Sequence, residues 1–205
     1  MARSKSIPKW IEKISACYTL LVLFELVLCL YFKRPVLIIF VIYLQAPLLW
    51  RLLKMFYGQP EGISYLGVKT KEGNLWWTAY HLQYLFNSFH FLEQILMLVP
   101  GLYSAWLRLW GSDIGKKVNW TPECRVVDRT HMKIGSRCLI GNRSYLAAHA
   151  IKKRDDRYLL YVKGVDIGDD VVLSYLVTVA PGAVIKSRSF IEAGSAVYPN
   201  ENVES

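Results

Sequence analysis

Residues 167–196 form five blocks of six residues: Ile167-Gly-Asp-Asp-Val-Val, Leu173-Ser-Tyr-Leu-Val-Thr, Val179-Ala-Pro-Gly-Ala-Val, Ile185-Lys-Ser-Arg-Ser-Phe and Ile191-Glu-Ala-Gly-Ser-Ala. Each block opens with Ile, Leu or Val, and its fifth residue is Val, Ala or Ser. A fixed period of six residues is typical of hexapeptide β-helix solenoids. In such a solenoid each block makes one short strand and one corner, and three blocks close a coil of roughly 18 residues.

The same frame occurs in two earlier parts of the chain. It fits blocks that begin at Ile134, Ile140 and Leu146 and, shifted by two residues, blocks that begin at Ile114, Trp120 and Val126. The blocks group into four coils, at residues 114–131, 134–151, 167–184 and 185–202. The pattern therefore predicts a left-handed parallel β-helix over residues 112–205. A sheet of short alternating strands is the competing interpretation, but its period would be two rather than six.

Two apolar runs precede the solenoid. The first extends from about residue 14 to residue 32 with Glu25 as its only charge, and the second extends from about residue 36 to residue 57. The first run is near the length of a membrane-spanning helix, and Lys33-Arg34-Pro35 makes a tight turn between the two. Residues 1–58 are therefore predicted to form a transmembrane helical hairpin. The alternative is a hairpin that enters one leaflet and returns, because two charges lie in the turn.

Basic residues both before the first run and after the second predict that both ends of the hairpin are cytoplasmic. The solenoid is then expected at the cytoplasmic (inner) membrane, facing the cytoplasm. Glu25 is expected to pair with a neighbouring helix or another subunit, because a lone carboxylate inside a membrane is costly.

Residues 59–111 are predicted to contain a polar linker at 58–72 and two amphipathic helices. Apolar and aromatic residues recur at helical spacing from residue 74 to residue 99, and a second helix at 102–110 follows Pro100-Gly101. Two hypotheses stay open. The helices lie along the membrane, because Trp and Tyr beside Arg suit the headgroup zone, or they cap the open end of the solenoid.

The composition narrows the choice of partners. The formal net charge is +9, which favours anionic neighbours such as lipid headgroups, an acidic carrier protein or a phosphorylated cofactor. No nucleic-acid partner is expected, because the aromatic residues lie in apolar runs and no nucleic-acid module is recognisable. The four cysteines have no CxxC spacing and are predicted to be reduced.

The repeat is interrupted at length by residues 152–166, and His149 stands just before this interruption. Excursions from solenoid corners are frequent sites of function. A neutral imidazole there could take a proton from an alcohol or an amine near physiological pH. His131 is a rival base, but it lies where the frame slips by two residues and no loop follows it. A surface histidine without a role is the plain alternative for His149.

These residues carry a resemblance to a known family. Val126-Val-Asp-Arg-Thr-His-Met-Lys-Ile134-Gly, followed by His149, the interruption and Val165-Asp-Ile167-Gly, resembles the hexapeptide-repeat acyltransferases, which include the galactoside and maltose acetyltransferases. The resemblance covers roughly residues 112–200. Residues 1–110 have no counterpart in the soluble sugar enzymes, so the chain looks like a membrane-bound branch of that superfamily.

The resemblance implies acyl transfer from a thioester, with His149 as general base, and a homotrimer that holds the donor between adjacent solenoids. Its implied substrate-binding residues are Asp128, Asn142 and Lys163, and its implied donor-binding residues are Ser174, Ala180, Gly182 and Lys186. Asp128 could equally stabilise a corner. The donor is expected to be acyl-CoA or an acyl carrier protein, because Ile185-Lys replaces the usual Ile-Gly. No permanent cofactor and no metal are expected, since the carbonic anhydrase of this fold needs three histidines.

The sequence therefore predicts a membrane-anchored acyltransferase that modifies a hydroxyl or amine of a lipid or lipid-linked acceptor. The anchor motivates the lipid acceptor. Two alternatives remain: a non-catalytic trimeric scaffold at the membrane, and an acetyltransferase acting on a soluble sugar.

Overall fold

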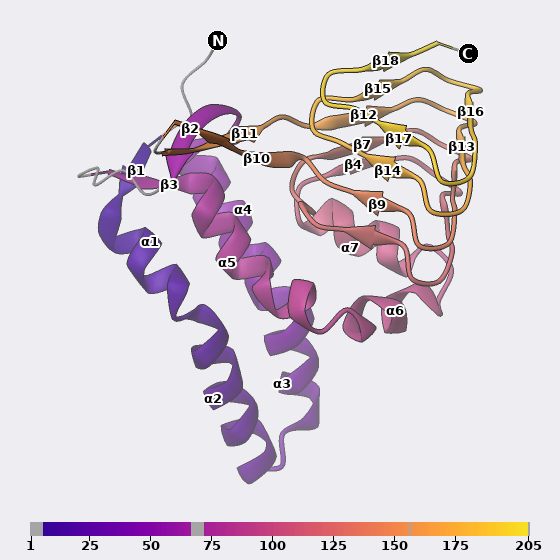
Figure 1. The fold of residues 1–205 in the computed structure, drawn as a ribbon. Coiled ribbons are helices and arrows are strands. Elements are labelled where there is room, and N and C mark those ends of the chain that lie inside the picture. Colours follow the sequence, from indigo (N-terminus) through magenta and orange to yellow (C-terminus); the bar gives the residue numbers. More distant parts are fainter. Residues whose placement is uncertain (1–5, 67–71, 156, 205) are drawn as a thin grey trace.

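The computed structural model describes residues 6–66, 72–155 and 157–204. Within this part of the chain, an N-terminal helical part packs beside a stack of short parallel strands formed by the C-terminal half (Figure 1). A small antiparallel sheet joins the two parts.

The C-terminal strands form three parallel sheets that the chain visits in turn. The first sheet contains β4 (Asp113–Ile114), β7 (Met132–Ile134), β12 (Val165–Ile167), β15 (Val184–Ile185) and β18 (Asn202–Val203). The second contains β5 (Asn119–Trp120), β8 (Leu139–Ile140), β13 (Val172–Leu173) and β16 (Phe190–Ile191). The third contains β6 (Arg125–Val126), β9 (Tyr145–Leu146), β14 (Thr178–Val179) and β17 (Ala196–Val197). Parallel sheets built from the predicted blocks are thus confirmed, while the left-handed winding stays a prediction.

The register follows the six-residue frame. Ile134 pairs with Ile114 on one side and with Ile167 on the other, so the first residues of equivalent blocks stack. These stacked aliphatic side chains are buried and form the solenoid core. The two-residue shift of the frame is taken up before Ile134, where β7 begins at Met132.

The corners show why the frame repeats. The fourth residue of most blocks has a positive φ, which turns the chain sharply. These residues are Lys117, Glu123, Arg137, Arg143, Asp170, Leu176, Gly182, Arg188, Gly194 and Asn200. Arg129 and His149 also occupy fourth positions but are not among them. The sharp turn with a positive φ is therefore missing at Arg129 and His149, which occupy the same corner of two successive coils.

The interruption of the repeat is an ordered sheet, not a loop. β10 (His149–Arg154) and β11 (Arg157–Val162) pair antiparallel, and β11 also pairs with β2 (Gly62–Leu66). The prediction of a polar linker at 58–72 is wrong for the residues of β2, and residues 67–71 lie outside the described residues. Leu160 and Val162 stabilise this sheet, because their side chains are buried against Trp76.

Two helical arms lie side by side in the N-terminal part (Figure 1). The first arm consists of α1 (Lys9–Ala16) and α2 (Tyr18–Tyr31), with a bend of 47° between them. α2 lies within the apolar run expected at about 14–32, and α1 begins before that run. The second arm is a continuous 23-residue helical segment of α3 (Pro35–Ile39), the π-helix η1 (Phe40–Leu44) and α4 (Gln45–Tyr57). Gln45 donates to both carboxylate oxygens of Glu25, at 3.1 and 3.0 Å, which gives that carboxylate a neighbouring-helix partner. β1 (Ser6–Pro8) pairs with β3 (Glu72–Asn74).

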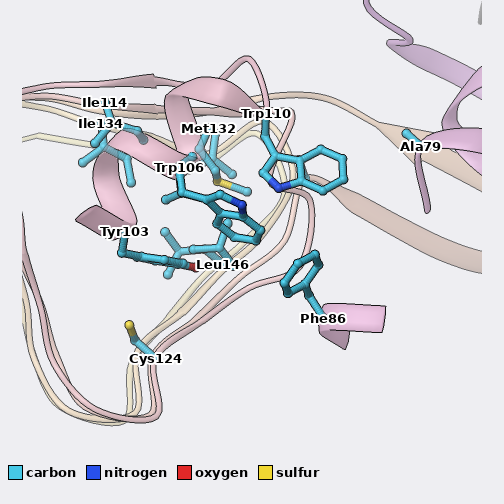
Figure 2. Packing of buried hydrophobic residues seen from close by; sticks show 14 of the residues in the cluster. Ala79, Phe86, Tyr103, Trp106, Trp110, Ile114, Cys124, Met132, Ile134 and Leu146 are labelled. Carbon is cyan, nitrogen blue, oxygen red and sulfur yellow. The ribbon is translucent and has the colours of Figure 1, made fainter. Parts of the chain in front are cut away.

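Three helices link the arms to the solenoid: α5 (Leu75–Ser88), α6 (Phe91–Met97) and α7 (Leu102–Leu109). The helix expected at 74–99 is thus broken between α5 and α6. A membrane-surface position is wrong for Trp76, Trp106 and Trp110, which are at most 4% exposed. Figure 2 shows Trp106 and Trp110 among buried residues of the first coils, so α7 covers the solenoid end as the cap hypothesis predicts.

Candidate functional site

Stacking of two successive coils brings Asp128 to His149. Val126 of β6 pairs with Leu146 of β9, so the two residues after each strand end lie beside one another. The Ala148 N–H donates to Asp128 Oδ2 at 2.8 Å, and His149 Nδ1 lies 2.7 Å from the same oxygen. This corner therefore forms a carboxylate–imidazole dyad from residues 21 positions apart.

The carboxylate of this dyad is buried and fully occupied. Asp128 is 1% exposed, and the indole N–H of Trp76 donates to its Oδ1 at 3.1 Å. Burial by itself would raise the pKa of Asp128, but the His149 hydrogen bond and the Ala148 N–H hold that pKa below its ordinary value. Asp128 is therefore ionised at neutral pH and accepts three hydrogen bonds.

The dyad fixes the tautomer of the imidazole. An ionised carboxylate can only accept, so Nδ1 of His149 carries the proton and Nε2 keeps a lone pair in the neutral ring. Trp76 packs against the ring, with the two ring centroids 4.7 Å apart. The His149 side chain is 16% exposed, so its ring is held in place yet reachable. This arrangement is suited to a general base.

A cavity of about 210 Å³ lies beside His149, between the solenoid corner and helices α5 and α6. Its lining includes His149, Tyr80, Tyr145, Arg125, Asn87 and His90. The helices thus close the base into a pocket that the solenoid alone would leave open.

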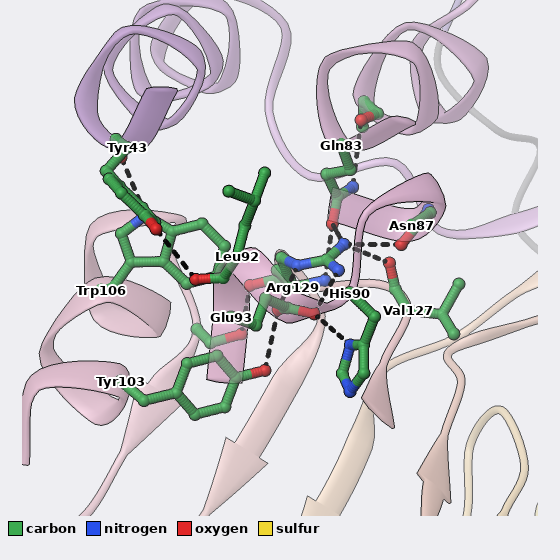
Figure 3. Close-up of polar contacts among 12 residues, drawn as sticks. Tyr43, Gln83, Asn87, His90, Leu92, Glu93, Tyr103, Trp106, Val127 and Arg129 are labelled. Carbon is green, nitrogen blue, oxygen red and sulfur yellow. Dashed lines mark hydrogen bonds and ion pairs between the residues drawn. The ribbon is translucent and has the colours of Figure 1, made fainter. Parts of the chain in front are cut away.

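Arg129, next to Asp128, locks the helices to this corner (Figure 3). It is 1% exposed, and its Nε and Nη2 donate to the two carboxylate oxygens of Glu93 on α6, at 2.7 and 2.8 Å. Its backbone N–H donates to Gln83 Oε1 at 2.7 Å, and its Nη1 donates to Asn87 Oδ1 at 2.8 Å. Tyr103 of α7 completes the network by donating to Glu93 Oε1 at 2.9 Å.

This ion pair is buried on both sides. Burial would raise the pKa of Glu93, but the Arg129 guanidinium and the His90 hydrogen bond hold it below its ordinary value. Burial would lower the pKa of Arg129, and the Glu93 carboxylate instead raises it. Both groups are charged at neutral pH, so neither can lose its partner without leaving a buried charge.

His131 is not available as a base. Its Nε2 lies 2.7 Å from the carbonyl oxygen of Pro60 and its Nδ1 lies 2.6 Å from Thr130 Oγ1, so both ring nitrogens are occupied. The ring is 5% exposed, and burial lowers its pKa even though Asp128 opposes this. His131 ties the segment before β2 to the solenoid, and its sequence ranking below His149 agrees with this position.

Three of the other predicted residues, Lys163, Ala180 and Gly182, lie at the corner of the dyad. Lys163 stacks between Ala148 and Gly182, because its N–H donates to the Ala148 carbonyl at 2.9 Å and its carbonyl accepts from the Gly182 N–H at 3.1 Å. Its Nζ donates to Asn200 Oδ1 at 3.0 Å. Ala180 immediately follows β14, on the approach to the same corner.

The remaining predicted residues lie elsewhere in this chain. Asn142 and Ser174 follow β8 and β13, at the corner that precedes the dyad corner along the chain. Lys186 follows β15, at the third corner. The structure therefore gathers Asp128, Lys163, Ala180 and Gly182 near His149, and leaves these three on other edges of the prism.

Sequence reasoning missed Trp76, Asn87 and Glu93, which the helices contribute, and Arg129 of the solenoid corner, to which Glu93 is paired. Glu93 carried a usable signal, because a lone carboxylate in an apolar helix needs a buried partner. The four cysteines are free thiols. Among the described residues, no group of three or more His, Cys, Asp and Glu side chains is arranged to hold a metal ion.

Two solved structures match part of this chain at low similarity. A hexapeptide-repeat-containing acetyltransferase of Vibrio cholerae O1 biovar eltor, complexed with acetyl coenzyme A, matches with 24% identity and a TM-score of 0.41 over 45% of this chain and 51% of its own. A maltose O-acetyltransferase of Clostridium difficile 630 matches with 17% identity and a TM-score of 0.45 over 55% of this chain and 77% of its own. No family model and no curated protein matches the sequence. At this level of similarity, we draw the function from the residues of the chain itself.

Proposed function

We propose that this protein is a membrane-anchored acyltransferase that moves an acyl group from a thioester donor to a hydroxyl or amine of a lipid or lipid-linked acceptor. One observation carries the proposal. An imidazole whose Nδ1 is held by a buried carboxylate, at 2.7 Å, presents its Nε2 at a cavity on a corner of a hexapeptide solenoid. The reaction that we assign to this base, acyl transfer, comes from the resemblance of the sequence to the hexapeptide-repeat acyltransferases.

The proposed reaction uses the dyad as follows. Nε2 of His149 takes the proton of the acceptor hydroxyl as its oxygen attacks the thioester carbonyl. The Asp128 carboxylate stabilises the imidazolium that forms. When the tetrahedral intermediate collapses, the carbon–sulfur bond breaks and the imidazolium gives its proton to the leaving thiolate. The products are the acylated acceptor and a free thiol, and His149 returns to its neutral state.

The membrane anchor is supported by the second helical arm. This arm of 23 residues is long and apolar enough to cross a bilayer, and only 22% of its most apolar 18-residue stretch is buried inside the protein. The first arm is long and apolar enough to cross a bilayer only if α1 and α2 form one bent span. We propose that the arms form the anchor, with the solenoid on the cytoplasmic side of the inner membrane. A hairpin that enters one leaflet remains the alternative topology.

Helix α6 supports contact with the bilayer. Phe91, Ile95 and Leu98, on or just after this helix, are 57%, 48% and 80% exposed, while Glu93 on its other face is fully buried. Exposed apolar side chains of this size suit a lipid surface better than water. Helix α6 would then separate the lipid from the cavity beside His149.

The homotrimer and the identity of the thioester also belong to the proposal. An acyl-CoA or an acyl carrier protein would lie between neighbouring solenoids, where Asn142, Ser174 and Lys186 of one copy could approach His149 of the next. Mass measurement of the detergent-solubilised protein tests the trimer, because a monomer would leave these three residues without a site to serve.

The proposed activity is tested in membranes that contain the full chain. Membranes with the wild type, with His149→Ala or with the exposed-residue control Lys116→Ala receive isotope-labelled acetyl-CoA, and lipids and soluble products are then separated by mass spectrometry. We expect labelled lipid with the wild type and the control, and none above background with His149→Ala. Equal labelling by all three would overturn the assignment of the base. Label only on a soluble sugar would favour the sugar acetyltransferase. No label with acetyl-CoA, and none with a labelled acetylated carrier protein in its place, would favour the scaffold.

A further inference from the structure

A second cavity, of about 320 Å³, lies between the first coil of the solenoid and helix α7. The turn from α6 to α7 contributes four of its lining residues, Met97, Val99, Pro100 and Gly101. Helix α7 and the first coil contribute two cations, Arg108 and Lys117. This cavity shares no lining residue with the cavity beside His149. It therefore combines an apolar turn with two basic side chains at a place that the proposed reaction does not use.

The two cations of this cavity have no carboxylate beside them. Arg108 Nε and Nη2 donate to the backbone carbonyl oxygens of Ile114 and Gly115, both at 2.7 Å, so these bonds use only two of its five N–H groups. The carbonyl groups carry no net charge, and the described lining of the cavity contains no Asp or Glu. The cavity therefore has a positive potential that an anion would offset.

Other exposed cations of the solenoid are neutralised within the chain. Three of them form ion pairs with a carboxylate of a neighbouring coil: Lys133–Asp166, Arg137–Asp170 and Arg143–Glu123. Lys117 occupies the same corner as Arg137, one coil earlier, and the Arg137 N–H donates to the carbonyl oxygen of Lys116 at 2.8 Å. Within the part of the chain that the structure describes, no carboxylate forms an ion pair with Lys117. Its charge is thus available to a ligand.

The two helices that bound this cavity lie beside the middle of the second arm. The hydroxyl group of Tyr43 in η1 donates to the Leu92 carbonyl at 3.0 Å, and Trp106 Nε1 donates to the Tyr43 carbonyl at 2.8 Å. Both arms continue past α6 to the turn between α2 and α3 (Figure 1). The turn from α6 to α7 therefore lies on the side of the protein toward which the proposed anchor extends.

This turn is apolar and exposed. Leu98, Val99 and Leu102 are all at least 42% exposed. Apolar side chains at the level where helices enter a bilayer suit the boundary between headgroups and acyl chains. Arg108 and Lys117 are then placed at the headgroup level, where a cation attracts anionic lipid.

A phospholipid matches both parts of the cavity. Its phosphate would accept hydrogen bonds from Arg108 and Lys117, and its acyl chains would lie along the apolar turn. A free phosphate ion would leave the apolar turn unused, and a purely apolar ligand would leave both cations unpaired. An anionic headgroup suits the cavity better than phosphocholine, because the choline cation would be repelled by the same two side chains.

We propose that this cavity binds the phosphate of an anionic membrane phospholipid and thereby holds the first coil of the solenoid against the bilayer. The site goes beyond the proposed function, from which it takes only the position of α6 at the membrane.

Two substitutions of neighbouring lysines separate this cavity from general surface charge. Lys117→Asn removes a cation from the cavity, and asparagine tolerates the φ of 57° at this position. Lys116→Asn removes the same charge from the adjacent exposed residue, which does not line the cavity. Val99→Ser tests the apolar turn. Arg108 is left unchanged, because its two carbonyl bonds secure the first coil to α7.

Binding is measured by native mass spectrometry of the full chain in an uncharged detergent. Phosphatidylglycerol and phosphatidylcholine with identical acyl chains are titrated in, and denaturation followed by tryptophan fluorescence verifies that each variant folds. We expect saturable binding of one phosphatidylglycerol per chain. Lys117→Asn should weaken this binding about fivefold, and Val99→Ser should weaken it about fourfold. Lys116→Asn should leave it unchanged.

Several results would overturn the lipid site. Equal binding of the two lipids would remove the role of the cations, and equal weakening by Lys116→Asn and Lys117→Asn would show only diffuse surface charge. Displacement of phosphatidylglycerol by equimolar inorganic phosphate would assign the cations to free phosphate and reject the lipid source. Binding that follows Lys117 in a protein without acyl transfer would support the lipid site and reject the proposed function. Acyl transfer by a protein that binds no phosphatidylglycerol would do the reverse.

Discussion

Replacing Asp128 by asparagine tests the dyad most directly. The two side chains have the same shape, but asparagine carries no charge and one of its two polar atoms donates. Asp128 accepts three hydrogen bonds, two on Oδ2 and one on Oδ1. The amide oxygen of asparagine should keep the two bonds from Ala148 and His149, which leaves its NH₂ facing the indole N–H of Trp76.

The expected losses follow from this geometry. The Trp76 N–H is left buried and unsatisfied, which costs about 1–3 kcal/mol of unfolding free energy. The bond from His149 changes from charge-assisted to neutral, and that difference is about 1–1.5 kcal/mol. If it acts on the developing imidazolium, kcat falls about tenfold.

A double-mutant cycle with Trp76→Phe separates the two effects. Phenylalanine removes the indole N–H, so Asp128→Asn should cost about 1–2 kcal/mol less stability in that background. The fall in kcat should be the same in both backgrounds, because the imidazole partner is unchanged. The assays are denaturant unfolding in detergent, followed by fluorescence, and acyl transfer from acetyl-CoA. A kcat that survives Asp128→Asn unchanged would refute the dyad, and equal stability losses in the two backgrounds would refute the role of the indole.

Three further outcomes follow from the structure. Glu93→Gln should lower the unfolding free energy by about 3–5 kcal/mol, because it leaves Arg129 as an unpaired buried charge, and urea unfolding measures this. Gly141→Ala should also destabilise the protein strongly, since an added Cβ would lie 2.2 Å from a backbone oxygen of the next coil. Gly194→Ala is the control, because an added Cβ there would meet open space. It should lower the unfolding free energy by only about 1 kcal/mol, the cost of placing alanine at a positive φ. Equal losses of melting temperature in the two variants would contradict this. Acidification from pH 7 to pH 5 should lower the free energy of unfolding. The pKa of His131 is lowered in the folded protein, so on acidification this histidine takes up a proton in the unfolded chain before it does so in the folded protein, and this favours unfolding. His131→Gln should flatten this part of the curve, and an unchanged slope would show that other groups cause it.

The sequence predicted the short parallel strands well because the constraint on them is local. Ile134, Ile140 and Leu146 are at most 2% exposed, and each opens a block. A side chain that points into a narrow core at every coil must be apolar at a fixed interval, and the interval is visible in the chain itself. The small fifth residues carry the same information, as Cys138 shows with 1% exposure.

The antiparallel sheet could not be predicted in this way. The run Tyr158-Leu-Leu-Tyr-Val162 has the composition of a strand, but its partner is Gly62–Leu66 in a distant segment. Periodicity identifies a strand and not the strand with which it pairs. The prediction of a linker before α5 failed for this reason.

The site lies between these two cases. The place of His149 before the interruption made it the predicted base, and this assignment stays a prediction. Asp128 was left between two roles, because only the stacking of coils brings it into contact with His149. Arg129 was missed, although Glu93 signalled that a buried cation was needed. Trp76 was assigned to the membrane surface or the cap from composition alone, and its hydrogen bond to Asp128 depends on a packing that no local pattern contains.

The order of residues in the site has a consequence for synthesis. Glu93 leaves the ribosome 36 residues before Arg129, and Asp128 leaves it 21 residues before His149. At about 5–20 residues per second, the arginine that secures the helices precedes the imidazole by about one to four seconds. A nascent chain that ends between them contains both helical arms and lacks His149. Under the proposed function, the proposed anchor is therefore synthesised before the proposed base.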